Sequence, residues 1–349
     1  MGRLKSKKTY LSLFGLFIVV IFSFLGYFYY WLNHSVLEKN KSIEYYAPHG
    51  ASFTRIIYDL YKLKIIDNPK LFIFYSGLLN EKKYIKYGTY RFLDNDTPSS
   101  ILLKLIQGNT IVIKVTLPEG LNIYQISQRF EKYFPSVSTQ QWLQYFSDSS
   151  FVQQIGLKER VRNIEGFLFP QTYFFDPHPE PQFMIKFILT EFKKNVTQQM
   201  FDKAKSMGLT PLQFITLASI VEKETGLNSE RRMVSAVYHN RIKKKMRLQA
   251  DPTVIYGAWD KYMGLLTKKE LLTPTLYNTY TFAGLPVGPI ASPGIDSFLA
   301  TLNPANIDAI YFVATGRGGH IFSNNLKEHN KAVSQYIHYL REEKKKKKL

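Results

Sequence analysis

Two glutamates, Glu222 and Glu224, stand at the end of an apolar segment and have the side chains that a general acid needs. Residues 214–221 before them are almost all apolar or small. Thr210, followed by a proline, is typical of a helix start, and Gly226 is typical of a helix end. Carboxylates near a helix C-terminus oppose the helix dipole, and burial disfavours their charged form. Both effects raise the pKa, as required of an acid that protonates a glycosidic oxygen near neutral pH.

The direction of the side chains favours Glu222 over Glu224. Both flank Lys223 symmetrically around the helix, so periodicity does not separate them. Side chains lean toward the helix N-terminus, so Glu222 covers the small residues 218–219, which leave a hollow, and Glu224 covers the bulkier residues 220–221. In the alternative interpretation, both glutamates lie on the surface and pair with nearby cations: Lys223, Arg231 and Arg232.

Downstream segments have the composition of a sugar site. Residues 247–253 and 277–280 carry amides, hydroxyls and aromatic rings, which hold sugars by hydrogen bonds and stacking. They lie in a stretch rich in Gly, Pro, Asn and Tyr, and such loops often carry function. A helix is expected to begin at residue 228 or 229, and its basic end, residues 241–245, is predicted to be a solvated face.

Other kinds of active site lack the residues that they need. The absence of cysteine removes disulfides, zinc–thiolate sites and thiol catalysis. The seven histidines are scattered, so we expect no metal and no cofactor, and we interpret His320 and His329 as structural. Residues 316–319 lack the Lys-Ser/Thr of a phosphate loop and predict a hairpin turn between strands 310–313 and 320–322.

The net charge of +19 indicates an anionic partner. No nucleic-acid-binding motif accompanies the charge, and a negatively charged wall or membrane surface explains it equally well, so we expect no nucleic acid as a partner. Residues 341–349 contain five consecutive lysines that repel one another. This end is therefore predicted to be a frayed, solvated tail.

The amino terminus has the pattern of a membrane anchor. Residues 11–32 are uncharged and long enough to cross a hydrocarbon core, and residues 1–10 carry four positive charges. Positive flanks stay in the cytoplasm, so the rest of the chain is predicted to lie outside the cytoplasmic (inner) membrane, in the periplasm. A cleaved signal peptide is the alternative, but its apolar region would be shorter, and residues 27–32 offer no small-residue cleavage site.

Residues 43–117 predict a small α+β unit of the kind seen in LysM modules. β-rich, turn and helical patterns alternate along this region. The expected elements are strand 43–47, a helix from residue 53, strand 86–92, helix 97–107 ended by Gly108, and strand 111–117.

The remaining residues predict two further regions in an overall α+β chain. Turn 118–120 and a helix from residue 123 repeat the first strand–turn–helix arrangement. Residues 118–206 predict a mainly helical connecting region, and residues 207–340 predict a catalytic region of mixed helices and strands.

Several motifs in one order resemble the endolytic murein transglycosylases of the YceG-like family. The similarity covers nearly the whole chain, and the motifs are residues 217–225, 247–257, 277–280 and 284–290, followed by His329 and Asn330. The resemblance implies a LysM-like subdomain followed by a catalytic domain. It also implies that the first glutamate of the IVEKE motif, here Glu222, is catalytic.

The resemblance further implies a lytic reaction on peptidoglycan glycan strands, next to the wall-synthesis machinery. Glu222 would protonate the bridging oxygen, and the 6-hydroxyl of the same muramic acid would attack C1, leaving a 1,6-anhydro end. One carboxylate suffices, because water is not the nucleophile. As hypotheses, Glu165 and Glu224 support the site, and five residues position the glycan: Gln249, Asp251, Tyr277, Asn278 and Tyr280.

Two residues depart from the usual pattern of the family, and two alternative functions remain. Gln171 stands where the family usually has Asp, and Val287 replaces a common Pro. A hydrolytic muramidase would recruit a second carboxylate, for which Asp251 is the candidate. A membrane-tethered glycan-binding scaffold would keep the fold with an inert Glu222.

Overall fold

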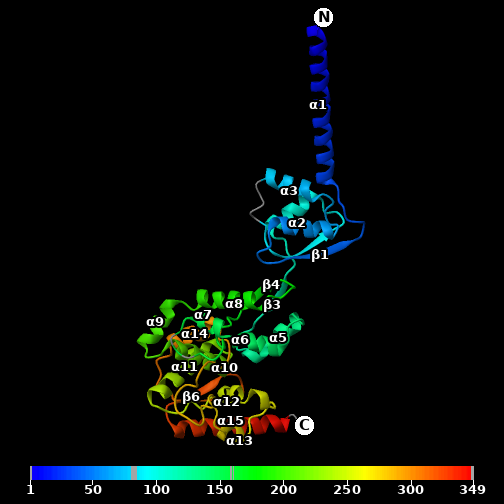
Figure 1. Cartoon of the computed structure of the whole chain (residues 1–349). Coiled ribbons are helices and arrows are strands. Elements are labelled where there is room, and N and C mark those ends of the chain that lie inside the picture. Colours follow the sequence, from blue (N-terminus) through cyan, green and yellow to red (C-terminus); the bar gives the residue numbers. More distant parts are fainter. Residues whose placement is uncertain (1, 80–84, 158, 160, 347–349) are drawn as a thin grey trace. The chain divides into compact units, whose positions relative to one another are not determined.

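The computed structural model describes residues 2–79, 85–157, 159 and 161–346 (Figure 1). Helices and strands are mixed, as the predicted α+β class requires. The chain forms two compact units. The first runs to Ile113 and includes Phe174–His178, and the second contains Lys114–Tyr173 and the chain from Pro179 onward.

The first unit is built around one antiparallel strand pair. Strands β1 and β2 pair from Ser42↔Leu93 to Ala47↔Gly88. Its elements are α1 (Gly2–Asn33), β1 (Ser42–Ala47), α2 (Phe53–Lys62), α3 (Pro69–Leu78), β2 (Gly88–Leu93) and α4 (Pro98–Gln107). The predicted strands and the helix ended by Gly108, whose φ is 72°, are present. Sequence periodicity missed α3, although Asn68 caps it and proline opens it.

Helix α1 is apolar at one end and packed into the first unit at the other. Its segment Leu11–Asn33 is long and apolar enough to cross a membrane. Trp31, near its end, is buried with the core of the unit, and its Nε1 donates to Asp67 at 2.7 Å. The helix therefore continues directly into a folded body.

Strands β3 (Ile113–Thr116) and β4 (Thr172–Phe175) form a second pair, where the chain passes between the units. The predicted strand 111–117 is thus found in shortened form. The turn at 118–120 leads into α5 (Ile123–Tyr133), which Asn122 opens with a capping box to Gln125.

The second unit is mainly helical and holds most of residues 118–340, except Phe174–His178, which belong to the first unit. Besides α5 and the C-terminal elements, it comprises α6 (Thr139–Phe146), α7 (Ser149–Ile155), α8 (Pro181–Asn195), α9 (Gln198–Ser206), α10 (Pro211–Glu224), α11 (Asn228–Lys243), α12 (Asp251–Gly257), the 3₁₀ turn Trp259–Lys261, α13 (Lys268–Leu272) and α14 (Ile295–Leu302).

Helix α10 lies at the centre of this unit. Thr210 caps it, as predicted, and forms a capping box with Gln213. All eight residues from Phe214 to Val221 are buried, as the apolar composition predicts. Helices α11 and α14 pack against it, so its last turn is held between neighbouring elements.

Two predictions at basic segments were wrong in part. Residues 243–245 are exposed as predicted, but Arg241 is buried, because its guanidinium donates to the carbonyls of Ile310 (2.7 Å) and Leu248 (2.6 Å). The chain does not fray at residue 341, since α15 (Leu326–Lys346) continues to Lys346, and residues 347–349 of the predicted tail lie outside the described residues. Cations suit a helix C-terminus, and Glu342 and Glu343 pair with lysines one turn later.

The hairpin near the C-terminus was predicted correctly. Strands β5 (Tyr311–Ala314) and β6 (His320–Ser323) pair antiparallel around residues 316–319. His320 contributes to structure here, as its Nδ1 lies 2.7 Å from Glu230 Oε2. His329 stacks on Tyr311 with ring centroids 4.9 Å apart.

Candidate active site

The carboxylate of Glu222 is fixed at the first turn of α14. Its side chain is only 6% exposed. Oε2 accepts hydrogen bonds from the Gly294 backbone N–H at 3.0 Å and from the Ser297 hydroxyl at 2.7 Å. Gly294 has no side chain to cap the helix, and the Glu222 carboxyl group takes this place by accepting from the Gly294 N–H.

Arg231 on α11 gathers three carboxylates around Glu222. Its Nη2 lies 3.4 Å from Glu222 Oε1 and 3.6 Å from Glu119 Oε2, and its Nη1 lies 3.4 Å from Asp296 Oδ2. The Arg231 side chain is 7% exposed, and its Nε has no hydrogen-bond partner among the described residues. A buried guanidinium with this many acidic neighbours orients them by charge and by its fork of donors.

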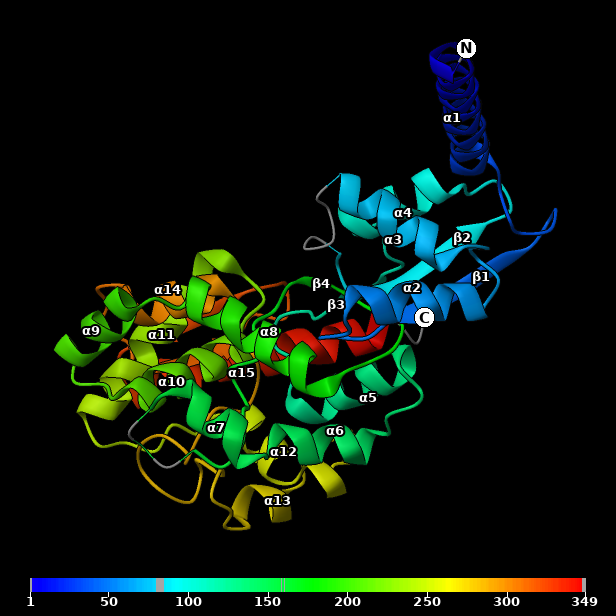
Figure 2. The ribbon, with the colours of Figure 1, turned by 45° about the horizontal axis from the view of Figure 1, so that its top comes forward.

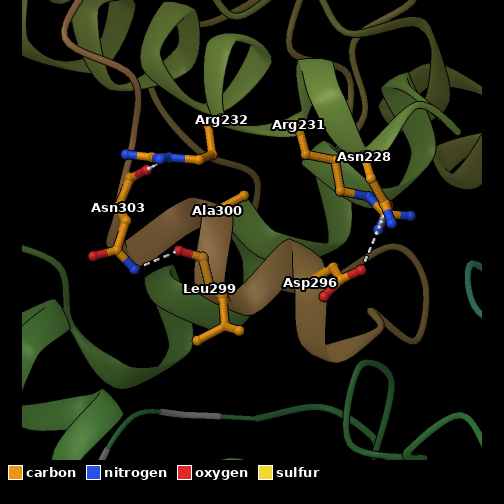
Figure 3. A pocket seen from close by; sticks show the side chains of 7 residues that line it. All are labelled: Asn228, Arg231, Arg232, Asp296, Leu299, Ala300 and Asn303. Carbon is orange, nitrogen blue, oxygen red and sulfur yellow. Dashed lines mark hydrogen bonds and ion pairs between the residues drawn. The ribbon is translucent and has the colours of Figure 1, made fainter.

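A pocket of about 490 Å³ lies beside this cluster, between α11 and α14 (Figure 3). Figure 3 shows Arg231 directed toward Asp296, and Arg232 directed toward Asn303. The pocket is lined by Asn228, Arg231, Arg232, Asp296, Leu299, Ala300 and Asn303. The polar lining gives solutes a path to the arginine that holds Glu222.

The turn at 118–120 closes the other side of Glu222. Lys223 Nζ donates to the Gly120 carbonyl at 3.1 Å, and the Gly120 N–H donates to the Ser292 carbonyl at 2.8 Å. A Cβ added at Gly294 would lie 1.9 Å from Glu119 Oε1, so only glycine permits this approach. The side chain of Glu119 is therefore packed against the backbone that binds Glu222.

Of the two glutamates on Arg231, Glu119 is more exposed than Glu222, with 46% of its side chain accessible. Its pKa is raised, mainly by burial and next by the negative charge of Glu222, while Arg231 opposes the shift. Glu119 therefore holds a proton to higher pH than an ordinary glutamate. A group of this kind can donate a proton to a bound sugar.

Glu224 belongs to a separate cluster. Tyr238 on α11 donates to its Oε1 at 2.7 Å. Burial raises the pKa of Glu224 to about 7, the charge of Asp251 adds to the shift, and the Tyr238 hydrogen bond opposes it. Tyr280 donates to Asp251. The predicted site residues Glu224, Asp251 and Tyr280 are therefore brought together here rather than at Glu222.

Two predicted glycan-binding residues have different surroundings. Gln249 is exposed in a left-handed conformation (φ 49°), with its backbone N–H bonded to the Thr279 carbonyl at 3.2 Å. Asn278 is fully buried, and its amide donates to three backbone carbonyls of residues 270–273. In this structure Asn278 shapes the loop instead of facing a ligand.

Glu165 is buried beneath an aromatic cluster. Its Oε2 accepts from the Ile123 N–H at 2.9 Å, and burial raises its pKa to about 8 against the hydrogen bonds from Ile123 and Tyr256. Tyr277 packs edge-on against Tyr256 at 4.6 Å between centroids. Partly exposed Tyr124 stacks on Trp259 at 5.5 Å and 9°. Flat aromatic surfaces of this kind suit sugar rings, and sequence analysis had not singled out these two.

The loop of residues 284–294 joins the aromatic cluster to Glu222. An added Cβ at Gly288 would lie 3.8 Å from the Tyr277 hydroxyl. Further along, the Ile290 N–H donates to Ser219 Oγ at 3.1 Å, and Gly294 then reaches Glu222. Residues 288–294 are buried, so the loop connects the two places through the interior of the unit. Val287, one of the two departures, lies exposed on this loop.

Gln171, the other departure, lies at the β3–β4 pair. Its carbonyl accepts from the Leu117 N–H at 2.9 Å, just before the turn that carries Glu119. Gln171 therefore supports the start of this turn through its backbone. Among the residues that the structure describes, no group of three metal-ligating side chains suited to an ion is found.

Sequence analysis missed Glu119, Asp296 and Ser297 as site residues and considered Arg231 only as a surface partner. They lie far from Glu222 in the sequence, and only the packing of the turn, α11 and α14 brings them together. The available signal was the Pro-Glu-Gly turn at residues 118–120, which opens the second strand–turn–helix arrangement and whose glycine has φ 74°. A charged residue inside such a turn is a candidate for function.

Comparison with known proteins supports one family. The model of the YceG-like family matches residues 45–335. A protein of Bacillus subtilis named endolytic murein transglycosylase is 31% identical over 86% of both chains. A protein of Streptococcus pneumoniae with the same name is 26% identical over 95% of this chain, which spans 65% of that relative's length.

A solved structure agrees with these sequence matches. The 2.6 Å crystal structure of a YceG-like protein from Listeria monocytogenes has 32% sequence identity to this chain and a TM-score of 0.57. The match covers 84% of this chain and 99% of the Listeria chain. With the family match extending over most of the sequence, the chain belongs to the YceG-like family.

Proposed function

We propose that this protein is a membrane-anchored endolytic peptidoglycan lytic transglycosylase that cleaves the MurNAc–GlcNAc bond within nascent glycan strands. The observation that carries the proposal is the position of Glu222. Its carboxylate is fixed by Gly294, Ser297 and Arg231 beside the more exposed Glu119. The relatives named endolytic murein transglycosylases support the same reaction.

In the proposed reaction Glu222 acts first as acid and then as base. It gives its proton to the bridging oxygen as the bond from that oxygen to muramic acid C1 breaks. The 6-hydroxyl of the same sugar then bonds to C1 and returns its proton to Glu222. The products are a new GlcNAc 4-hydroxyl end and a 1,6-anhydroMurNAc end, and no water is consumed. The fixed carboxylate favours this intramolecular step, because little reorganisation is needed.

Two parts of the protein support glycan binding, one in each unit. The aromatic pair Tyr124 and Trp259 is partly exposed, and its flat rings suit stacking against sugar rings of the strand. Gln249, Tyr277 and the pair of Asp251 with Tyr280 are assigned to hold sugars farther from the bond that breaks. The first unit, which includes residues 43–113 of the predicted LysM-like region 43–117, is assigned to bind the same strand.

The proposed membrane arrangement is supported by α1 and its flanks. Helix α1 anchors the protein in the cytoplasmic membrane, with the four positive charges of residues 1–10 in the cytoplasm and both folded units outside. This location places the enzyme beside strands that are still attached to the membrane. Cleavage there terminates elongation, in partnership with the wall-synthesis machinery.

A hydrolytic muramidase is the second candidate, because Glu119 offers a second carboxylate. Glu119 and Glu222 each lie within 3.6 Å of the same Arg231 nitrogen. Hydrolases use such pairs to activate water or to attack the sugar. Asp251, the carboxylate that sequence analysis considered for this role, contacts the Glu224 cluster instead.

Mass spectrometry of digested peptidoglycan distinguishes these functions. Detergent-solubilised full-length protein is compared with Glu222→Gln and with Glu343→Gln, a matched change at an exposed ion pair. Anhydro ends made by wild type and Glu343→Gln, and lost in Glu222→Gln, are expected. Reducing ends would establish the hydrolase, and intact strands with retained binding would indicate a glycan-binding scaffold.

A further inference from the structure

The end of α1 is part of the first unit rather than a free tether. Phe28 contacts α3, with ring centroids 6.3 Å from Phe74 and 6.1 Å from Tyr75. Trp31 is buried in the same core, and Ser99 of α4 donates to the Leu32 carbonyl at 3.0 Å. The position of α3 and α4 along the axis of α1 is therefore fixed.

The length of α1 places these contacts at the edge of the hydrocarbon layer. Lys8 is the last cation before the apolar segment. A helix rises 1.5 Å per residue, so Phe28 lies about 30 Å beyond Lys8. The hydrocarbon core of a bilayer is also about 30 Å thick, and any tilt of the helix draws Phe28 further inward. Phe28 and its neighbours on α3 thus reach the outer boundary of the lipid.

The surface at this level is apolar. In both views α3 lies at the end of the first unit from which α1 emerges (Figures 1 and 2). Phe74 is 49% exposed, and Leu78 and Leu79 follow it on the same surface. A groove of about 460 Å³ beside them is lined largely by apolar side chains of α3 and α4, among them Leu103. Neither helix contains an acidic residue.

We propose that the surface formed by Phe74, Leu78, Leu79 and Leu103 is embedded in the outer leaflet of the membrane, where its occupant is phospholipid. This inference rests on the anchoring in the proposed function. Its support is the continuity of the surface with lipid-facing α1 through Phe28. A soluble partner would have to displace lipid at this depth, whereas apolar side chains gain free energy by entering the headgroup–acyl boundary.

The absence of cysteine allows a direct test by single-cysteine labelling of the full-length protein. Phe74→Cys and Leu103→Cys report on the proposed surface, and the second also guards against a folding defect in the first. Leu16→Cys, within the apolar part of α1, reports on anchoring. Tyr87→Cys is the matched control, because Tyr87 is 52% exposed in the same unit.

Tyr87 is expected to lie well away from the membrane. It precedes the Gly88 end of β2, whereas the Leu93 end leads to Asp94, whose carbonyl accepts from Ser35 just after α1. The six residues of β2 separate these two ends by roughly 17 Å. A label at position 87 should therefore remain in water.

Each variant carries an environment-sensitive fluorophore and is placed, one copy per nanodisc, in lipid with or without shallow nitroxide-labelled acyl chains. The proposal predicts that the labels at 16, 74 and 103 lose at least half of their emission to the nitroxide lipid, and that the label at 87 does not. Labels at 74 and 103 that behave like 87, while 16 is quenched, would overturn the proposal and leave anchoring intact. An unquenched label at 16 would refute both the embedded surface and the membrane anchoring. Product analysis would still test the enzyme activity.

Discussion

Replacing Arg231 by methionine would remove a cation that contacts Glu222, Glu119 and Asp296 together. Methionine keeps much of the length and apolar volume of the arginine stem, so the change acts mainly on charge and hydrogen bonding. Arg232→Met is the matched control on the same helix. Arg232 is exposed, and its Nε donates to the Asn303 carbonyl at 2.7 Å.

The expected loss in the free energy of unfolding follows from the burial of the two side chains that form the ion pair. Both Arg231 and Glu222 have side chains less than one-tenth exposed. Breaking a buried pair by removing one partner costs about 3–5 kcal/mol. Glu222 keeps its bonds to Gly294 and Ser297, which places the expected loss near the low end, about 3 kcal/mol. The exposed Arg232 should cost less than about 1 kcal/mol.

The loss should also depend on pH in a defined direction. The pKa of Glu119 is raised by burial and by Glu222, and Arg231 holds it down, so Arg231→Met raises it further. A raised folded-state pKa contributes stability that is present below the unfolded pKa and lost as pH rises through the folded value. The stability deficit of Arg231→Met should therefore be smallest near about pH 4 and grow toward neutral pH.

Urea unfolding at several pH values, followed by tryptophan fluorescence, measures this deficit. Cleavage of peptidoglycan at neutral pH should fall in Arg231→Met as well, because the orientation of Glu222 is lost. Equal deficits in Arg231→Met and Arg232→Met, or a deficit that shrinks as pH rises, would refute the assignment of Arg231 as the residue that orients the carboxylates.

Two further predictions concern neighbouring carboxylates. Glu119→Gln should reduce cleavage by roughly 100-fold if Glu119 takes part in proton transfer. Asp296→Asn, which changes another carboxylate on the same arginine, should reduce cleavage far less. Equal rates of anhydro-end formation in the two variants would exclude a role of Glu119 in proton transfer. Glu165, whose pKa of about 8 lies above its unfolded value, makes the wild type lose stability as pH rises from about 5 to 8. Glu165→Gln should gain about 1 kcal/mol or more relative to wild type over this window, and parallel stability curves would contradict the burial argument.

Local patterns predicted the helix that carries Glu222. The cap at Thr210 and the buried residues of α10 follow from composition and spacing alone. The small residues 218–219 also marked the side where other chain segments approach, since Ser219 Oγ accepts the Ile290 N–H there. Local reasoning works at these positions because each effect involves residues within one or two helical turns.

The surroundings of Glu222 depend on distant segments, so sequence spacing could not predict them. Arg231 was expected on a surface but is buried, because Glu119 and Asp296 approach from a turn and from α14. Asn278 has the side chain of a sugar ligand but satisfies backbone carbonyls of its own loop. Polar residues of the same type bind ligands or stabilise loops, and only the tertiary contacts decide which.

The first unit is discontinuous along the chain, and this has a consequence for biogenesis. Thr89 donates to Asp176 through its backbone N–H and its hydroxyl, across 87 positions of sequence. During synthesis, which proceeds from the N-terminus, Thr89 leaves the ribosome long before Asp176 becomes available. Completion of the first unit must therefore wait for the first segments of the second unit. A nascent chain halted before residue 174 would leave buried donors unsatisfied and present a substrate for quality-control proteases.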